Sequence, residues 1–533
     1  MRRAREFGAV RRVYFRPEFR TCPVCGTPLG YSHPVWRKHI IGMKEVIWAG
    51  SLGYRCPRPE CGSRVYRSAE AESLSLKGSS YGFDVLIAVG TMRTVDHCTR
   101  AEIHAELRQR GVPISERHVQ DLYEAYLALL CCTARRQVEA AMPRIEKNGG
   151  MVISLDGIQP EKGNEALWVV REVLTGVVLT AANVQSASSA RLQELLRPVV
   201  EMGLPILGVV SDGQHSIKLA VKALLPGVPH QCCQFHYLRD VALPFSDDDR
   251  KLRTEVRKKL RGILRVEEKV AGRDDPEAEV VRGYCAAIRA VLLDDGRPPL
   301  EPGGIRAYEN MERIYSSLTR CLAVSPTREL ETLARIAARH REQEEQYLAL
   351  KVQHGWLVEV ERAIDPDNYP GLPPQEAVNQ AQDRLQAIVA QVNEVAATRP
   401  EHRRFAESLS MYTRGFGDSL FTCFLNPLIP RTNNDLERFL RRAKGAHRRT
   451  TGRASWDGYI VRYGELAAYA TSAPPETLAR WFAEVRTDEY RAQMRYWRAR
   501  QEPRRQRLRY RKMPAAYLES LERSWLAHKI RAP

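Results

Sequence analysis

Three acidic residues far apart in the chain each lie at or near the boundary of a predicted element. Asp156 ends the β-rich run 151–156, Asp212 follows the buried run 206–211, and Glu437 lies early in a helix predicted to begin near residue 434. Hard divalent cations prefer oxygen ligands, and Mg²⁺ commonly binds carboxylates while keeping water and phosphate oxygens. Two such ions about 4 Å apart can activate an attacking oxygen and stabilise a leaving one. An aspartate at a strand end is by itself a common turn or cap residue, so the predicted site for two Mg²⁺ or Mn²⁺ ions depends on the combination.

The helix predicted after residue 434 has two distinct faces. A 100° step per residue places its apolar residues on one face and its charged residues on an adjacent face. The apolar set is Leu436, Phe439, Leu440 and Ala443. The adjacent face carries Glu437, Arg441, Lys444 and Arg448. Glu437 is thus a single carboxylate among cations, which predicts that this helix holds a phosphate backbone beside the metal site.

The chain is basic, with 82 Lys and Arg against 64 Asp and Glu, a net charge of +18. Two runs concentrate this charge: residues 438–453 carry seven cations and no acid, and residues 495–512 carry nine cations and only Glu502. A single charged run is usually a solvated face, but phosphate neutralisation releases counterions and adds affinity. Neither run has the apolar face of a membrane-surface helix. We therefore expect nucleic acid as the partner, contacted by Arg438, Arg441, Arg442, Lys444, Arg448 and Arg449.

Four cysteines near the start form two close pairs, Cys22 with Cys25 and Cys56 with Cys61. Two such pairs on glycine-containing turns can present four thiolates to Zn²⁺, as in a zinc ribbon. His33 and His39 lie between the pairs and could replace a thiol. The alternative is a set of reduced structural cysteines. We expect structural zinc.

Residues 82–130 have helical periodicity. One helix covers 101–107, residues 110–114 break it, and Ser115 caps a second helix. Two helices joined by a short turn form either a plain hairpin or a helix-turn-helix whose second helix enters the major groove. In the second case Arg117, His118 and Gln120 would face the bases.

The rest of the chain predicts an α/β domain split by helices. Strands at 151–156, 166–174 and 177–184 precede alternating helices and strands up to residue 235, with a hairpin turn at Thr175-Gly176. The predicted class is multidomain α/β plus all-α. The predicted domains are a zinc-ribbon-like domain (1–75), a helix-turn-helix domain (76–147), the first part of the α/β domain (148–245), an all-helical insertion (246–425), the second part of the α/β domain (426–475) and a basic helical C-terminal tail (476–533).

No stretch approaches 18 uncharged apolar residues, and the start of the chain leads into no apolar segment of signal-peptide length. The expected location is the cytoplasm.

Four segments together resemble the DDE transposases of bacterial insertion sequences related to the Mutator and hAT superfamilies. They are Ser154-Leu155-Asp156-Gly157, Val210-Ser211-Asp212-Gly213, Cys233-Gln234-Phe235-His236 and Thr432-Asn433-Asn434-Asp435-Leu436-Glu437-Arg438. Those enzymes have a ribonuclease-H-like catalytic domain with a helical insertion between the second aspartate and the glutamate. The corresponding gap here is 224 residues, 213–436.

The resemblance implies that Asp156, Asp212 and Glu437 bind two Mg²⁺ ions. Water would then cut the transposon end, and the freed 3′-hydroxyl would attack target DNA. It further implies double-stranded DNA as substrate, a homodimer or higher oligomer, and association with the bacterial nucleoid. Cys233 and His236 are expected to support the site through packing and orientation. In hAT-like relatives an aromatic residue of the insertion stacks a flipped base, which makes Trp356 a candidate, although a core tryptophan is the simpler interpretation.

Two other functions fit the same features. A transposase-derived, zinc-containing regulator would bind DNA through residues 1–140 without chemistry. A ribonuclease-H-like, structure-specific nuclease would cut DNA without joining the ends.

Overall fold

The computed structural model is mixed α/β with mostly helical content, and it describes residues 10–62, 64–159, 164–260, 262–452 and 457–530. The chain divides into two compact units. The first unit contains residues 1–151, 155–205 and 434–533, and the second contains residues 152–154 and 206–433.

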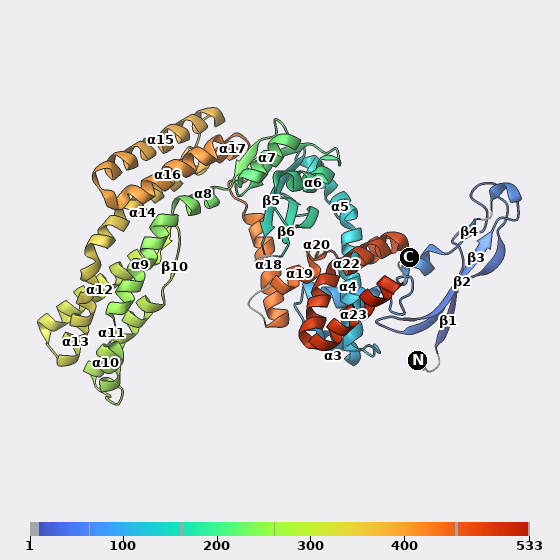
Figure 1. The fold of residues 1–533 in the computed structure, drawn as a ribbon, viewed down its shortest axis with the longest axis horizontal. Helices are drawn as coiled ribbons and strands as arrows, with labels where there is room; N and C mark the ends of the chain where they lie inside the picture. The colour runs from blue at the N-terminus through green and yellow to red at the C-terminus, as the bar shows by residue number, and fades with distance from the viewer. Residues whose placement is uncertain (1–9, 63, 160–163, 261, 453–456, 531–533) are drawn as a thin grey trace. The chain divides into compact units, whose positions relative to one another are not determined.

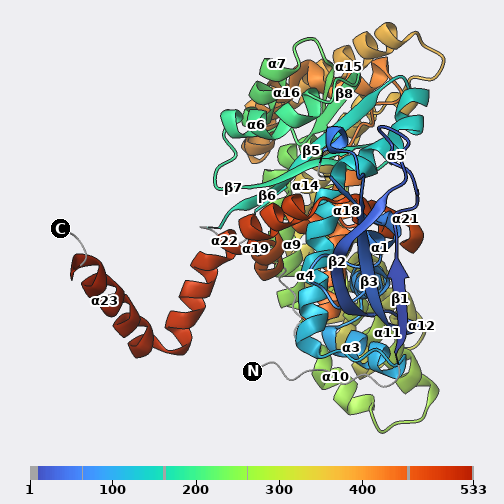
Figure 2. The same cartoon turned by 90° about the vertical axis from the view of Figure 1, so that its right-hand side faces the viewer.

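The first unit begins with a four-stranded sheet, seen in Figures 1 and 2 as neighbouring blue arrows. Its strands are β1 (Arg11–Phe15), β2 (Gly30–Ile41), β3 (Val46–Arg55) and β4 (Val65–Tyr66). The order is β1-β3-β2, with β4 on β3; β1 runs parallel to β3, and β2 and β4 run antiparallel to it. A short 3-10 helix, Pro59–Cys61, carries the last cysteine of the group.

Five helices follow: α1 (Ala69–Ser73), α2 (Phe83–Thr94), α3 (Arg100–Gln109), α4 (Glu116–Cys132) and α5 (Ala134–Lys147). The predicted pair at 101–107 and after 115 is confirmed as α3 and α4. Thr99 and Glu102 form a capping box on α3, and the Ser115 side chain accepts the backbone N–H of His118 at the start of α4. These caps satisfy N–H groups that have no partner inside a helix, which is why both helices begin where they do.

The central sheet has the strand order β7-β6-β5-β8-β9. Its strands are β5 (Met151–Ile158), β6 (Ala166–Glu172), β7 (Val178–Val184), β8 (Ile206–Ser211) and β9 (His230–Cys232), with α6 (Ser189–Val200) and α7 (His215–Leu224) between them. The predicted hairpin at Thr175-Gly176 is confirmed, because β6 pairs antiparallel with β7 and Gly176 has a φ of 75°. β8 pairs parallel with β9. Strand β5 contributes Val152–Ser154 to the second unit and its other residues to the first.

Helices dominate the remainder of the second unit. They are α8 (Gln234–Val241), α9 (Leu243–Lys259), α10 (Ile263–Val270), α11 (Pro276–Leu293), α12 (Gly303–Val324), α13 (Arg328–Ala338), α14 (Glu344–Ile364), α15 (Pro374–Thr398), α16 (Arg403–Phe416) and α17 (Thr422–Leu425). Among its described residues, the segment expected to be entirely helical contains one small exception, the paired strands β10 (Gly296–Arg297) and β11 (Glu301–Pro302). The proline-rich turn 297–299 imposes this local reversal, because proline cannot donate within a helix.

The first unit resumes with α18 (Asn434–Thr451), α19 (Asp457–Tyr463), α20 (Glu465–Ala468), α21 (Pro475–Glu484), α22 (Thr487–Lys512) and α23 (Pro514–Ile530). The segment predicted as a basic tail is partly built into the core. On α22, Met494 and Trp497 are buried, and Trp497 Nε1 donates to the Arg462 carbonyl over 2.8 Å. Together with Gln501, these are the buried positions of a helix that is otherwise rich in arginine.

Candidate active site and metal centres

Asp156 lies on β5 in the first unit, beside a glycine that is needed for steric reasons. Its side chain is half-buried, and Oδ1 accepts the Gly157 N–H over 2.7 Å. A Cβ at position 157 would lie 2.4 Å from Trp168 Cε2 on β6, closer than two carbons can approach. Gly157 is therefore required by the packing against β6, and its N–H holds the Asp156 carboxylate.

Glu437 lies on α18 in the same unit, and the predicted two-faced character of this helix is confirmed. Leu436 is fully buried, and Phe439, Leu440 and Ala443 pack against the core of the first unit. Glu437 is half-buried. The apolar face thus sets the rotation of α18, and the rotation sets the direction of the glutamate.

The start of α18 is held by Arg171, a residue that the sequence did not single out. The guanidinium is buried. Its Nη1 donates to Asp435 Oδ2 over 2.6 Å and to the Asp435 carbonyl over 3.2 Å, while Nη2 donates to the Gly176 carbonyl over 2.6 Å. It also lies 4.5 Å from the centroid of the Phe439 ring. Burial lowers the pKa of Arg171 from its usual value, and the charge of Asp435 opposes that shift. Arg171 therefore joins the β6–β7 hairpin to the helix that carries Glu437.

Arg171→Met is expected to lower the free energy of unfolding of the first unit by about 3 kcal/mol, because it leaves the Asp435 carboxylate and the carbonyls of Asp435 and Gly176 without their buried partner. Arg191→Met is the matched control. Arg191 pairs with Glu194 at the same 2.6 Å, but both side chains are about 60% exposed. An exposed pair contributes about 0–1 kcal/mol. Urea unfolding of both variants, followed by circular dichroism, measures the difference, and equal midpoints would contradict the anchoring role.

The cations predicted to contact DNA lie on the exposed side of α18. Arg438, Arg441, Arg442, Lys444, Arg448 and Arg449 are all exposed. Arg453 of the same run lies outside the described residues. Within the described part of α18, none of these six has a carboxylate within 4 Å that would neutralise it, so the exposed side is strongly positive.

Asp212 lies directly after β8 in the second unit. Its Oδ1 accepts the backbone N–H of Gln214 over 2.9 Å, and Gly213 has a φ of 83° that allows the sharp turn into α7. The preceding Ser211 is fully buried, and its Oγ lies 2.8 Å from His230 Nε2 on β9. Burial lowers the pKa of His230 to about 4, so this imidazole is neutral at pH 7. The end of β8 is thereby fixed by hydrogen bonds on both sides of Asp212.

Cys233 and His236, expected to support the site, are buried on the turn after β9 and on α8. The Cys233 sulfur accepts the backbone N–H of Asn433 over 3.4 Å, and the backbone N–H of Gln234 donates to the Arg431 carbonyl over 3.0 Å. Within the second unit, these bonds hold the end of the 427–433 loop to the turn between β9 and α8. Arg431 is further fixed by ion pairs with Asp365 and Glu361.

Asn433 has an unmet hydrogen-bonding requirement that the sequence pattern could not reveal. Its side chain is 1% exposed, and neither Nδ2 nor Oδ1 has a hydrogen-bond partner among the described residues. A buried amide without partners costs about 1–3 kcal/mol. In the sequence, only its position in the Asn-Asn-x-x-Glu segment indicated that Asn433 could have a functional role. A bound substrate or water would satisfy this group.

Trp356, considered above as a base-stacking residue, lies in the helical core of the second unit. It is 9% exposed, and its ring lies 5.0 Å from that of His402 and 6.1 Å from that of Phe405. A base could stack on this ring only if that packing opened. The core interpretation fits the observed surroundings.

The three residues predicted to read bases lie at the start of α4, but they differ in exposure and in the hydrogen bonds that they already make. Arg117 and His118 are exposed and line a cleft of about 1110 Å³ in the first unit. Gln120 is half-buried, and its Nε2 donates to the Tyr463 hydroxyl over 2.8 Å and to Glu124 over 3.0 Å. A base contact by Gln120 would require breaking these bonds. His118 Nδ1 lies 2.9 Å from Ser115 Oγ, so a base contact through that nitrogen would also break a bond, whereas Arg117 is exposed.

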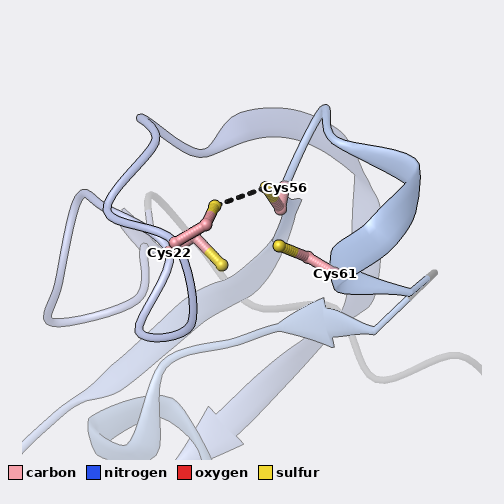
Figure 3. A group of neighbouring side chains, drawn as sticks. Cys22, Cys56 and Cys61 are labelled. Carbon is pink, nitrogen blue, oxygen red and sulfur yellow. Dashed lines mark hydrogen bonds between the residues drawn. The ribbon is translucent and has the colours of Figure 1, made fainter.

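Cys22, Cys25, Cys56 and Cys61 come together at one end of the N-terminal sheet. Their sulfur atoms all lie within 4.8 Å of one another, and none forms a disulfide. Figure 3 shows Cys22, Cys56 and Cys61 pointing toward a common centre. Cys25 Sγ lies 3.5 Å from Cys56 Sγ. Four thiolates at the Zn–S distance of 2.3 Å would have sulfurs about 3.8 Å apart, so the spacing fits zinc.

The surroundings of these cysteines favour a thiolate at one of them. The hydroxyl and backbone N–H of Thr27 lower the pKa of Cys25 to about 6, with the hydroxyl oxygen 3.3 Å from the sulfur. Thiolate is the form that binds metal. His33 and His39, which could have replaced a thiol, are not members of the four-sulfur group. The four cysteines therefore form a possible structural zinc site.

Comparison with known proteins identifies one domain. Residues 171–294 match the family model "Transposase, Mutator family". This match supports a transposase of the Mutator superfamily, an enzyme class that cuts and joins DNA and commonly uses divalent metals. The matched segment contains Asp212, Cys233 and His236, while Asp156 and Glu437 lie outside it. No curated protein matches the chain significantly. Among the described helices, none has the length and apolar character needed to cross a membrane.

Proposed function

We propose that this chain is a DDE-type DNA transposase that binds transposon ends, cleaves the DNA by metal-dependent hydrolysis and joins the 3′ ends to target DNA. The observation that carries the proposal is the match of residues 171–294 to Mutator-family transposases. The net charge of +18 and the exposed cations of α18 support DNA as the partner.

Asp156, Asp212 and Glu437 are the proposed ligands of two Mg²⁺ or Mn²⁺ ions. Asp156 lies on β5 and Asp212 directly follows β8, so each carboxylate is held at or near the end of a strand, where sites of α/β sheets form. All three carboxylates are half-buried oxygen donors of the kind that Mg²⁺ prefers. The bound metals would supply an activated oxygen nucleophile and charge stabilisation at the leaving oxygen.

The chain's own residues would position the DNA. The exposed cations of α18 would bind backbone phosphates next to Glu437. The buried amide of Asn433 can both donate and accept, so it fits a substrate group or an ordered water. Arg117 and His118 at the start of α4 are the proposed contacts to the transposon ends, and the four-cysteine zinc site would stabilise the fold of the N-terminal sheet.

The test uses purified full-length protein and a plasmid that carries this gene with its native flanking DNA. After addition of Mg²⁺ or Mn²⁺, new 3′ ends and joined products are mapped by sequencing. Cuts at repeated flanking sequences together with joined ends are expected. Cuts without joining would favour a ribonuclease-H-like nuclease. Tight binding without cuts would favour a transposase-derived regulator.

A further inference from the structure

We propose that one face of the N-terminal sheet binds unpaired bases and phosphates of single-stranded DNA. This rests on the proposed function, since the strand would come from the DNA that the enzyme processes, but it identifies a surface that the family match does not include. The surface is called the open face, and its members are Arg12, Tyr14, Tyr31, Arg37, His39, Trp48, Gly50 and Tyr54.

The strand register places these residues on one side of the sheet. Arg12 and His39 both pair with Trp48, Tyr14 and Arg37 both pair with Gly50, and Tyr31 pairs with Tyr54. Side chains at i and i+2 of a strand share a face, so the even-numbered positions of β3 lie on the same side. Figure 2 shows β1, β3 and β2 side by side.

Contacts between the side chains confirm this arrangement. The Tyr14 and Trp48 rings meet edge to face with centroids 5.5 Å apart, and the Arg12 guanidinium carbon lies 5.7 Å from the Trp48 centroid. A Cβ at Gly50 would lie 3.2 Å from Tyr14 Cδ1 and 3.6 Å from Arg37 Cγ. Both side chains therefore lean across Gly50, and the glycine makes room for them. Tyr31 and Tyr54 form a second edge-to-face pair at 5.8 Å.

The opposite face of the sheet is occupied by the protein itself. Trp36 Nε1 donates to Glu72 Oε1 over 2.9 Å, and Lys38 Nζ donates to the carbonyls of Leu76 and Ser79. On the open face, Tyr14 is 50% exposed and Tyr31 is 55% exposed. In the part of the chain that the structure describes, neither Arg12 nor Arg37 has a carboxylate within 4 Å.

This combination fits a nucleic-acid strand better than a protein or lipid partner. Residues 11–67 carry 11 Lys and Arg against three Asp and Glu, a net charge of +8 within 57 residues. Aromatic rings held at intervals on a basic sheet are a platform on which bases stack, while cations neutralise the backbone. The base faces of a closed duplex are covered by neighbouring bases. Exposed aromatic rings can therefore stack on the bases of an unpaired strand but not on those inside a duplex. This positive charge is separate from that of the two C-terminal runs, 438–453 and 495–512.

The test measures binding by full-length protein without added Mg²⁺ or Mn²⁺, with fluorescein-labelled dT20 and a 20-base-pair duplex as probes. Tyr14→Ala is expected to weaken dT20 binding about 10-fold, because one stacked base contributes about 1–3 kcal/mol. Tyr14→Phe keeps the ring and should bind as the wild type does. Arg37→Ala should lower the slope of log K against log salt for dT20 by about 0.7. Zinc content and circular dichroism of each variant verify that the sheet is folded.

The proposal is overturned if folded Tyr14→Ala and Arg37→Ala bind dT20 as the wild type does. It is also overturned if they lose only duplex binding, because the face would then be a duplex contact. Failure of the proposed function is distinguishable, since it would appear as absent metal-dependent cleavage while the effects on dT20 binding remain.

Discussion

Asp156→Asn is expected to lower metal-dependent DNA cleavage by about 10³-fold or more, because carboxylate ligands position metals that contribute several kcal/mol to the transition state. Asparagine has nearly the same shape and retains an oxygen that can accept the Gly157 N–H, so the local strand geometry should persist. What it lacks is the negative charge. Asp212→Asn and Glu437→Gln should have effects of similar size, because the three acids are proposed to act as one unit.

The measurement is the initial rate of new 3′ ends on the plasmid with native flanks, compared at equal protein and saturating Mg²⁺. Glu201→Gln is the matched control, since it also neutralises one acid but lies exposed just after α6 in the first unit. It should cleave at the wild-type rate. If Asp156→Asn cleaves as fast as Glu201→Gln, Asp156 is a turn residue and the metal site has been misassigned.

Cys56→Ser is expected to remove nearly all bound zinc and to unfold the N-terminal sheet. The zinc-binding free energy of small zinc domains is about 10–16 kcal/mol and is largely folding free energy. Cys56 is buried immediately after β3, and its partner Cys61 lies on the following 3-10 helix, so losing this ligand would release the segment that leads to β4. Metal analysis should give about one zinc ion per wild-type chain and close to none in the variant.

Hydrogen exchange locates the unfolding. In Cys56→Ser, amides of β2 and β3 should lose protection, while those of α9 and α11 in the second unit should keep it. Cys98→Ser is the control, because Cys98 is a half-buried free cysteine outside the four-sulfur group. It should retain zinc and protection. A Cys56→Ser protein with full zinc content and a protected sheet would show that the cysteines are structural thiols only.

Much of the local structure could be predicted, because its causes lie within a few residues. Ser115 begins α4 as expected from its capping hydroxyl, and Thr175-Gly176 closes the β6–β7 hairpin because glycine tolerates a positive φ. The four cysteines were recognisable from their spacing alone. In contrast, the paired strands β10 and β11 inside the segment expected to be entirely helical were not predicted.

Whether a candidate site residue is accessible to a ligand could not be predicted from its local sequence. Gln120 occupies a base-reading position in the helical pattern, yet its amide is engaged by Tyr463, 343 residues later. Trp356 has the chemistry of a stacking residue but is surrounded by its own helical core. Periodicity describes which side of a helix a residue occupies and carries no information about which distant segment covers that side.

The sequence by itself determined the chemistry that this protein has available: three carboxylates with local contexts typical of a transposase, four thiols with zinc-ligand spacing, and a large excess of positive charge. Only the tertiary structure decided how these groups are held. It pairs Arg171 with Asp435, 264 residues away, and so fixes the helix of Glu437. It also leaves one face of the N-terminal sheet exposed while the protein covers the other. The physical reason is that composition and spacing are properties of the chain, whereas burial and pairing arise from contacts between distant segments, formed only when the apolar faces of the helices and strands pack together.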